Sequence, residues 1–418
     1  MRLYKRGIQN FRLIKLVKNL LPVLVFLLLV RHSPWCRADE KTSLKPLFPI
    51  QLDHEFPESK ESFEKIKDLI IKHYYNSGIS EKALYWAAIQ GMLRHISPPE
   101  KPDLSRIWTP EEYEIYRQSI EGVQVSIGIK SSFNANEGSL TITQVLPDSP
   151  ADSILKPLDR ILRIDGLSLK GKSLEALNRL LAGKEGTAVT LTVNRDIKVF
   201  DVILKHRKFD TTSVVVNRLT DTIALLEIKK FTANISKKLR DELNKLKDDK
   251  FRGLIIDLRN NPGGIFQESL RTAELFLPKK RILLRAVQQK IGLRNYVSDN
   301  PEPFEYDMAI LVNQNTASMA EAFSSSLQDH KKALLIGTRT FGKGVFERTF
   351  TLENNYRVKF ITGAMYSPAG RTWQSKGVVP DFLVEQGEKT LDHLFSLEAK
   401  ERFRKDVAMI TAYKLLSR

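Results

Sequence analysis

The stretch Leu254-Ile-Ile-Asp-Leu-Arg-Asn-Asn-Pro-Gly-Gly264 decides the fold class of the central part of this chain. Its apolar beginning, Leu254–Leu258, has the length and flanks of a buried strand, and Pro262 followed by two glycines predicts a tight turn directly after it. Upstream, the pattern predicts a strand over Thr222–Lys229 and a helix over Ser236–Lys247. A strand, a helix and a second buried strand in this order indicate a mixed α/β domain.

The pattern extends in both directions from this core. Apolar residues recur at helical spacing over about 56–118, and short strands follow with one helix near Ser173–Leu181, for which Ser173 is the expected cap. Further strands are predicted over Met308–Val312, Ala333–Ile336 and Arg357–Ile361, and the charged tail from Leu391 is helical in pattern. The expected segments are a signal peptide or N-terminal anchor at 1–38, a linker and helical region at 39–118, a β-rich domain at 119–208, an α/β core at 209–385 and a helical tail at 386–418.

Composition and charge exclude several classes of protein. With 418 residues and a hydrophobic fraction of 42%, the chain can bury more than one core. Its formal net charge is +17, but eight of the basic residues lie within 1–38 with no acidic residue, which leaves +9 for the remainder. That remainder is spread through segments of mixed sign without a nucleic-acid-binding motif. We therefore expect a solvated basic surface and no nucleic-acid partner.

The N-terminus has the pattern of a targeting segment. A basic stretch through Lys18 is followed by the apolar run Leu20–Val30, whose eleven residues are too few to span a bilayer comfortably. Small side chains at Cys36 and Ala38 predict cleavage after Ala38, and an uncleaved anchor is the alternative, in which case only this segment would contact a membrane. Cys36 is the only cysteine, so the processed chain would suit an oxidising compartment without disulfides. In either case the body is expected to be periplasmic or otherwise extracytoplasmic.

Three segments are candidates for chemistry. The turn Pro262–Gly264 can direct backbone N–H groups at a ligand, as an oxyanion hole requires, although such turns are often purely structural. In Leu311–Glu321 a strand runs into a helix with Ser318 at the junction, where its own amide and the next can face a reacting carbonyl; a simple helix cap is the alternative. In Thr340–Gly344 two glycines flank Lys343, and a lysine serves as a base only in its neutral form.

Together these segments resemble the C-terminal processing peptidases, also called tail-specific proteases. In that family a serine in Asn-x-x-x-Ala-Ser is followed 25 residues later by a lysine in Gly-Lys-Gly, as Ser318 and Lys343 are here. The Asp-Leu-Arg-x-Asn-Pro-Gly-Gly turn recurs as well, and so does the late stretch Tyr366–Asp381. The similarity runs in order from about residue 60 to residue 385. It implies a crotonase-like α/β serine protease core.

The resemblance also implies a mechanism. Lys343 would accept the proton of Ser318, an acyl-enzyme would form, and water would release it. The oxyanion would be held by the Met319 amide and a glycine amide of the turn, Gly263 in preference to Gly264. No metal or organic cofactor is implied, and the seven histidines lack metal-ligand spacing.

The chain departs from the family at Glu347. Four residues after the lysine the family commonly has a glutamine that hydrogen-bonds the lysine, and Glu347 stands at that position. A carboxylate favours the charged ammonium, whereas a general base must be neutral. Three arrangements are open: Glu347 faces solvent, is itself protonated, or pairs with Lys343 in a resting state that substrate disrupts. We favour the resting pair.

The segment 119–208 resembles a PDZ domain, a module that adds a peptide's C-terminal end as an extra strand. It departs from the family pattern at Ile154-Leu155, where it is about one residue shorter. The second half of the module is matched by Ser149–Ala151, Leu158–Ile161 and Asp165-Gly166. The expected carboxylate-binding loop consists of Ser126, Ile127, Gly128 and Ile129.

The resemblance therefore implies an exported serine endopeptidase that acts on polypeptides with accessible C-termini. A catalytically inactive scaffold that only binds C-termini through its PDZ domain is the first alternative, which intact Ser318 and Lys343 disfavour. The second alternative is the same two-amide geometry acting on acyl thioesters, which the PDZ segment and the export signal disfavour. The oligomeric state stays open, with a homo-oligomer among the options.

Overall fold

The computed structural model describes residues 59–417, apart from 76–77, 99–100, 102–103, 147, 211–213 and 247–250. The predicted targeting segment at 1–38 and the linker at 39–55 lie outside the described residues. No helix in the described part of the chain combines the length and the apolar character needed to cross a bilayer.

A mostly parallel six-stranded sheet forms the centre of the α/β core, in the order β10-β11-β12-β15-β16-β19. Its interior strands are parallel to one another and almost completely buried, which explains why they read as continuous apolar runs. The four strands predicted here are confirmed as β11 (Ile223–Ile228), β12 (Gly253–Asp257), β15 (Asp307–Val312) and β16 (Ala333–Gly337). The two edge strands, β10 (Val214–Arg218) and β19 (Phe382–Leu383), were not predicted.

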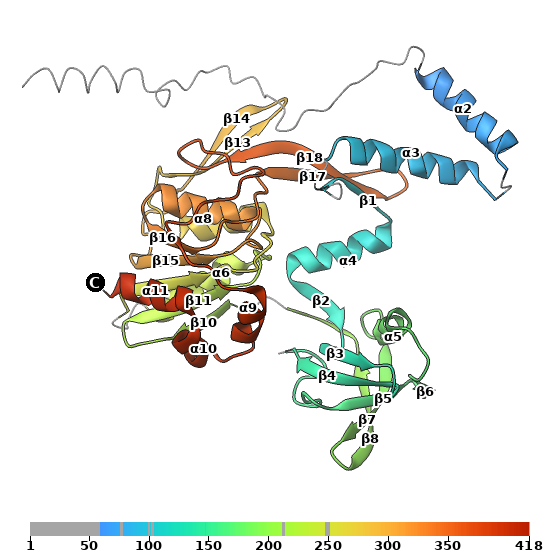
Figure 1. Ribbon diagram of the computed structural model, residues 1–418, viewed down its shortest axis with the longest axis horizontal. Coiled ribbons are helices and arrows are strands. Elements are labelled where there is room, and N and C mark those ends of the chain that lie inside the picture. Colours follow the sequence, from blue (N-terminus) through green and yellow to red (C-terminus); the bar gives the residue numbers. More distant parts are fainter. Residues whose placement is uncertain are drawn as a thin grey trace, which may run out of the picture. The chain divides into compact units, whose positions relative to one another are not determined.

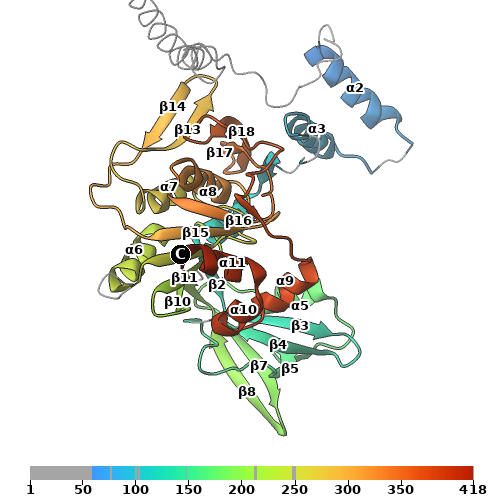
Figure 2. The ribbon, with the colours of Figure 1, turned by 60° about the vertical axis from the view of Figure 1, so that its left-hand side comes forward.

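Helices cover both faces of this sheet. On one face α6 (Ile235–Leu246), α7 (Phe266–Glu274) and α8 (Met319–Asp329) share a hydrophobic core with alternate residues of the strands. On the other face Ala408, Met409 and Ala412 of α11 (Val407–Leu416) pack on the remaining strand residues. Figures 1 and 2 show α8 and α11 on opposite sides of β15. The helical pattern predicted for the tail is confirmed, and the packing of its last helix against the sheet was not predicted. The other helices of the tail are α9 (Glu388–Phe395) and α10 (Ala399–Lys405).

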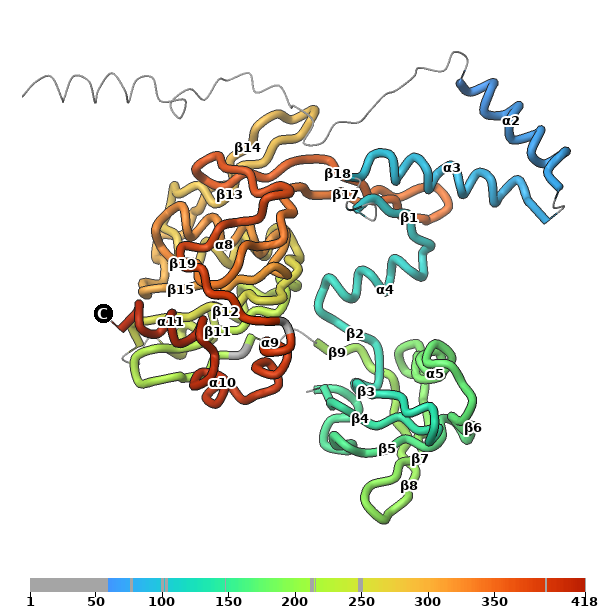
Figure 3. Tube along the Cα trace, in the orientation of Figure 1, coloured from blue at the N-terminus to red at the C-terminus, as the bar shows by residue number. Residues whose placement is uncertain are grey.

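A second, five-stranded sheet carries the segment after Lys343. The central strand of this region, β18 (Arg357–Tyr366), is longer than predicted and pairs with three others. One partner, β1, comes from the N-terminal region and was not predicted, because a three-residue strand between helical patterns leaves no periodic signal. The hairpin of β17 and β18 beside β1 can be followed in Figures 1 and 3. The other bounds are β1 (Arg106–Trp108), β13 (Ile282–Gln288), β14 (Gly292–Val297) and β17 (Val345–Thr351).

The predicted helical N-terminal region contains α2 (Ser59–His73), α3 (Glu81–His95) and α4 (Pro110–Glu121). Thr109 begins α4 with a capping box, because its hydroxyl accepts from Glu112 N–H while the Glu112 carboxylate accepts from Thr109 N–H. The helix ends at Glu121, three residues beyond the expected boundary at 118, and Gly122 follows as the C-cap in the left-handed conformation.

The β-rich region after α4 has its own core. Its main sheet has the order β3-β4-β5-β7-β8, with β6 beside β5, while β2 pairs with β9. The predicted helix is confirmed as α5 (Leu174–Leu181), and Ser173 caps it by accepting from Ala176 N–H. The strands are β2 (Val123–Ser126), β3 (Ile129–Asn134), β4 (Ser139–Val145), β5 (Arg160–Ile164), β6 (Leu167–Ser168), β7 (Ala188–Arg195), β8 (Lys198–Lys205) and β9 (Arg207–Asp210).

Candidate active site

The turns after β12 and β15 meet because the carboxyl ends of neighbouring parallel strands lie at the same edge of a sheet. Asn260 N–H donates to Asn313 Oδ1 at 2.9 Å, and Asn313 Nδ2 donates back to Asn260 Oδ1 at 2.8 Å. The Thr316 hydroxyl donates to Leu258 O at 2.8 Å. These bonds hold the glycine turn against the segment that leads to Ser318.

Gly263 lies directly against the predicted nucleophile. A Cβ atom at position 263 would lie 2.9 Å from Ala317 O, Met319 N and the Ser318 Cβ atom, and its φ of +100° also disfavours a side chain. Ser318 itself has φ 56° and ψ −119°, an unusual conformation for a residue with a side chain. Ser318 therefore lies in a strained backbone conformation immediately before the first turn of α8.

The amides around this turn are not equally available. Gly263 N–H donates to Asn261 Oδ1 at 2.8 Å, so this amide of the predicted oxyanion pair is engaged in the structure. Within the described residues, neither Gly264 N–H nor Met319 N–H is used in a hydrogen bond. The Ser318 amide, which the sequence argument left as a candidate, is also taken, because it donates to Glu321 Oε2 at 2.8 Å.

Glu321 links the two segments that carry the expected nucleophile and base. Its Oε2 accepts from Ser318 N–H and Lys343 N–H, both at 2.8 Å, while Oε1 accepts from Gly342 N–H at 2.7 Å and the Thr340 hydroxyl at 2.6 Å. Burial raises the pKa of the fully buried carboxyl group, and these four hydrogen bonds oppose that shift. Sequence reasoning missed this role, although Ser-x-x-Glu before an apolar run is a capping signature.

Lys343 is paired with Glu347. Its Nζ donates to Glu347 Oε1 at 2.7 Å, and the two side chains are only 18% and 12% exposed. Glu347 therefore does not face solvent, and the contact is the one that a resting pair requires. No hydrogen bond joins Ser318 Oγ to Lys343 Nζ within the described part of the chain. The fold brings the two segments together through Glu321, while the lysine amine is engaged elsewhere.

Comparison with known proteins identifies the family. The sequence profile of peptidase family S41 matches residues 222–384, and that of the PDZ domain matches residues 141–195. A relative from Staphylococcus saprophyticus named "Probable CtpA-like serine protease" is 30% identical over 338 residues, which cover 80% of this chain and 67% of the relative. This chain belongs to peptidase family S41. It is a serine peptidase of that family with a PDZ domain.

Other similarities agree with this assignment. A relative of the same name from Staphylococcus haemolyticus is 31% identical over 300 residues, covering 71% of this chain and 59% of the relative. The chain thus spans about three fifths to two thirds of the length of these relatives. A solved structure of a Bacteroides fragilis protein assigned to the S41 proteases has a TM-score of 0.54 at 14% identity, with 88% of this chain and 99% of that chain covered. That likeness shows a shared fold.

A buried ion network lies beneath the glycine turn of this S41 peptidase. Arg259 Nη2 lies 2.7 Å from carboxylate oxygens of both Asp257 and Asp406, and all three side chains are almost inaccessible. Burial alone would raise the pKa of Asp257, but the Arg259 charge and its hydrogen bonds bring it below the usual value. Asp406 also caps α11, with its carboxylate accepting from Ala408 N–H at 3.0 Å. The C-terminal tail is therefore joined to the base of the glycine turn by an ion pair.

The predicted peptide-binding loop forms one turn between β2 and β3. Gly128 has φ +81°, and a Cβ there would lie 1.9 Å from the Ser149 Cβ atom, so only glycine fits. Gly128 N–H donates to the Ser126 hydroxyl at 3.0 Å, and the carbonyl oxygen of buried Ile127 accepts from Ala151 N–H at 2.9 Å. Ile129 begins β3, an edge strand of its sheet that lies beside α5 in Figures 1 and 2. The shorter stretch still places Leu155 in the core of this domain.

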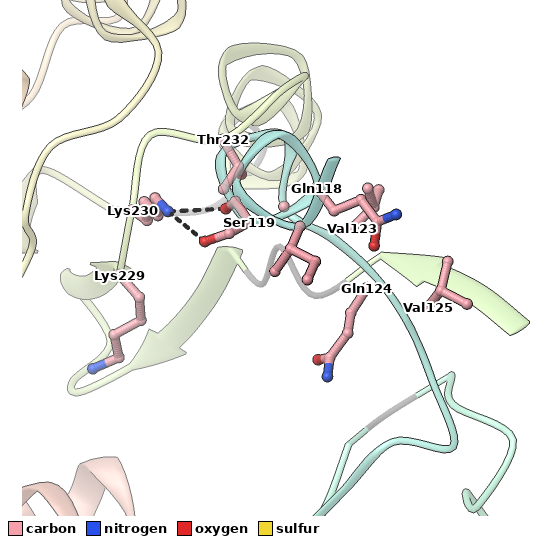
Figure 4. Close-up of a pocket in the computed structure, with 10 residues that line it drawn as sticks. Gln118, Ser119, Val123, Gln124, Val125, Lys229, Lys230 and Thr232 are labelled. Carbon is pink, nitrogen blue, oxygen red and sulfur yellow. Dashed lines mark hydrogen bonds between the residues drawn. The ribbon is translucent and has the colours of Figure 1, made fainter. Parts of the chain in front are cut away.

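A cavity of about 540 Å³ lies between the end of α4, the start of β2 and the segment after β11 (Figure 4). Lys230 Nζ donates to Ser119 O at 2.9 Å and to the Ser119 hydroxyl at 3.2 Å, and burial lowers the pKa of Lys230. Phe231 N–H donates to Gly263 O at 2.8 Å, so this segment is hydrogen-bonded to the glycine turn. Neither residue of the expected dyad lines the cavity.

Two histidines have ring nitrogens at hydrogen-bond distance from backbone carbonyl oxygens. His330 ends α8, and its Nε2 lies 2.7 Å from Ile282 O. Buried His206 has its Nε2 2.9 Å from Leu181 O. Among the residues that the structure describes, no cluster of three His, Cys, Asp or Glu side chains is arranged to hold a metal ion.

Proposed function

We propose that this S41 peptidase is an exported serine endopeptidase in which Ser318 is the nucleophile and Lys343 the general base. Its substrates would be polypeptides whose free C-termini bind the PDZ domain. The observation that carries the proposal is the Glu321 carboxylate, whose Oε2 accepts the backbone amides of both Ser318 and Lys343 at 2.8 Å. A shared buried acceptor fixes the backbones of nucleophile and base in one site, as a dyad requires.

The reaction follows from these positions. Neutral Lys343 takes the proton of the Ser318 hydroxyl as Oγ attacks the scissile carbonyl carbon. The C–N bond then breaks, the leaving amine takes the proton from Lys343, and an ester to Ser318 remains. Water attacks this ester with Lys343 again as base, releasing the new carboxyl terminus and the serine hydroxyl.

The oxyanion hole would use Met319 N–H and one glycine amide of the turn. For Gly263 to serve, Asn261 Oδ1 must release the amide that it now accepts at 2.8 Å. The Gly264 amide needs no such release, which makes it the alternative donor. In both cases the second donor comes from the turn that Arg259 and Asp406 brace.

The location is part of the same proposal. A basic stretch, a short apolar run and small residues before Asp39 support export, with either cleavage after Ala38 or retention as an anchor. The inactive scaffold is the competing function, and it would share the PDZ domain without turnover.

A polypeptide that ends in an apolar residue with a free carboxylate is expected to be cleaved several-fold faster than the same chain amidated at its C-terminus. The reason is that β3 is an edge strand beside α5, so a peptide can add to it while loop amides capture the carboxylate. The test incubates the protein with both forms of one unstructured polypeptide and maps the fragments by mass. Equal rates would mean that the domain does not read the terminus, and no fragments from either form would favour the scaffold.

Glu347→Gln is expected to move the rise of activity with pH to lower pH and to increase the rate near neutrality. Glu347 Oε1 stabilises the charged form of Lys343 at 2.7 Å, whereas glutamine can hold the amine without charge. The measurement is the rate of peptide cleavage against pH for both proteins. A shift to higher pH, or an unchanged profile, would contradict the resting pair.

A further inference from the structure

A second lysine lies beside the Lys343–Glu347 pair. Lys359 on β18 is 15% exposed, and its Nζ lies 3.7 Å from Glu347 Oε1. This is the same carboxylate oxygen that accepts from Lys343 Nζ at 2.7 Å. Glu347 Oε1 therefore lies near two lysine amines. Lys343 Nζ is at hydrogen-bond distance, and Lys359 Nζ is about 1 Å farther away.

Aromatic rings cover Lys359. Its Nζ lies 5.4 Å from the centroid of the Trp108 ring on β1 and 5.5 Å from that of Tyr116 on α4. Ring faces at this distance attract a cation, and they exclude the water that would otherwise screen the charges. An uncompensated second lysine in such a place would be costly, and Glu347 is the carboxylate beside it.

The charged and titratable groups around Lys359 come from four elements. They are Glu347 on β17, Lys343 in the loop before β17, Arg106 on β1 and Tyr116 on α4. Burial lowers the pKa of Lys359, Glu347 opposes this, and Lys343 and Arg106 act in the same direction as burial. Burial and the Glu347 charge raise the pKa of Tyr116 to about 12, so the phenol stays neutral near neutral pH.

The two lysines therefore compete for one negative charge. While Glu347 Oε1 accepts from Lys343 Nζ at 2.7 Å, the lysine amine is held in an ion pair and is not available to Ser318. If the carboxylate instead bonds Lys359, Lys343 loses its counter-ion and is left beside a second positive charge, and both effects favour the neutral amine. The shift needed at Lys359 is small, because its Nζ is already 3.7 Å from Oε1.

We propose that Lys359 is a positioning residue that competes with Lys343 for Glu347, so that transfer of the carboxylate to Lys359 frees Lys343 to act as the general base. The inference rests on the proposed Ser318–Lys343 dyad. It assigns Lys359 no contact with substrate. When Glu347 is bonded to Lys359, Lys343 has no bonded negative charge, as would be the case with a neutral glutamine at position 347. The pair adds a second, resting state in which Glu347 is bonded to Lys343.

The experiment measures kcat against pH for wild type, Lys359→Met, Glu347→Gln and the double variant. Lys359→Met is expected to move the rise of activity to higher pH by about one unit, which is roughly a tenfold lower rate on the acid side. With Gln at 347 the same substitution should shift the profile much less, because only direct repulsion between the lysines is lost. Lys359→Arg keeps the charge and should keep the profile near that of wild type.

Lys332→Met is the matched control, because Lys332 is 17% exposed and pairs with Glu305 at 2.6 Å but belongs to the turn after α8. Its profile should not move. The inference is overturned if Lys359→Met leaves the profile unchanged or shifts it equally with Glu and with Gln at 347. Should Lys359→Met fail to fold, Lys359→Gln gives the same comparison. If the Lys359 inference is overturned in this way but activity in every variant still requires Ser318 and Lys343, the proposed dyad stands and only the role of Lys359 fails.

Discussion

Ser318→Ala, Lys343→Ala and the double variant are expected to lose cleavage of an unstructured polypeptide to the same residual level, roughly 10⁴-fold or more below wild type. Nucleophile and base act as a unit, so removal of either leaves only what binding and the oxyanion hole supply. The loss should appear in kcat with little change in KM, because substrate binding is assigned to the PDZ domain and neither side chain belongs to it. The measurement is the initial rate of fragment formation by mass spectrometry, with a metal chelator present to exclude a contaminating metalloprotease.

Matched controls separate chemistry from folding. Ser324→Ala removes a buried serine of α8 whose hydroxyl donates to Ala320 O at 2.8 Å, and Lys332→Ala removes a lysine that is 17% exposed. Both should keep most of the activity. All variants are compared by thermal melting. Residual turnover well above the double variant in either single variant would contradict a Ser–Lys unit. A double variant that keeps a rate near that of wild type would place the nucleophile elsewhere.

The fold was predictable where burial leaves a simple pattern. Strands such as Leu254–Leu258 and Met308–Val312 are buried on both faces and therefore read as apolar runs, and each was placed to within one residue. β1 could not be found in this way, since its three residues are ordered by pairing with β18, far along the chain. Long-range pairing of this kind leaves no local signal.

The site was predictable only in part. Ser318 and Lys343 were singled out by resemblance to a family, and each alone also fitted a structural role. The contacts of Glu321 with Lys343 and of Lys359 with Glu347 join residues 22 and 12 positions apart, and only the fold creates them. The pairing of Lys343 with Glu347 was predicted from one departure from the family pattern, and the engaged amide of Gly263 was not.

Glu321→Gln is expected to lower kcat by roughly 10²-fold or more with a smaller change in KM. Glutamine keeps the shape of the side chain, but its amide group replaces one of two oxygens that each accept two donors. Two donors would then face an N–H group, and the backbones of Ser318 and Lys343 would lose their common acceptor or be pushed apart. Each donor left without a partner would also cost about 1–3 kcal/mol of stability.

Glu268→Gln is the control that separates positioning from stability. Glu268 is also a buried glutamate of a core helix, and its Oε2 accepts from Ser236 N–H at 3.1 Å and the Ser236 hydroxyl at 2.7 Å. It holds the start of α6 instead of the dyad, so its variant should melt at lower temperature with kcat nearly unchanged. Glu321→Gln should lose far more kcat than its loss of stability explains. If the loss of kcat in Glu321→Gln is no larger than its fall in melting temperature explains, by comparison with Glu268→Gln, then Glu321 is only a structural residue. A positioning role requires an additional loss of kcat, because the Ser318 and Lys343 backbones would move when the shared oxygen is lost.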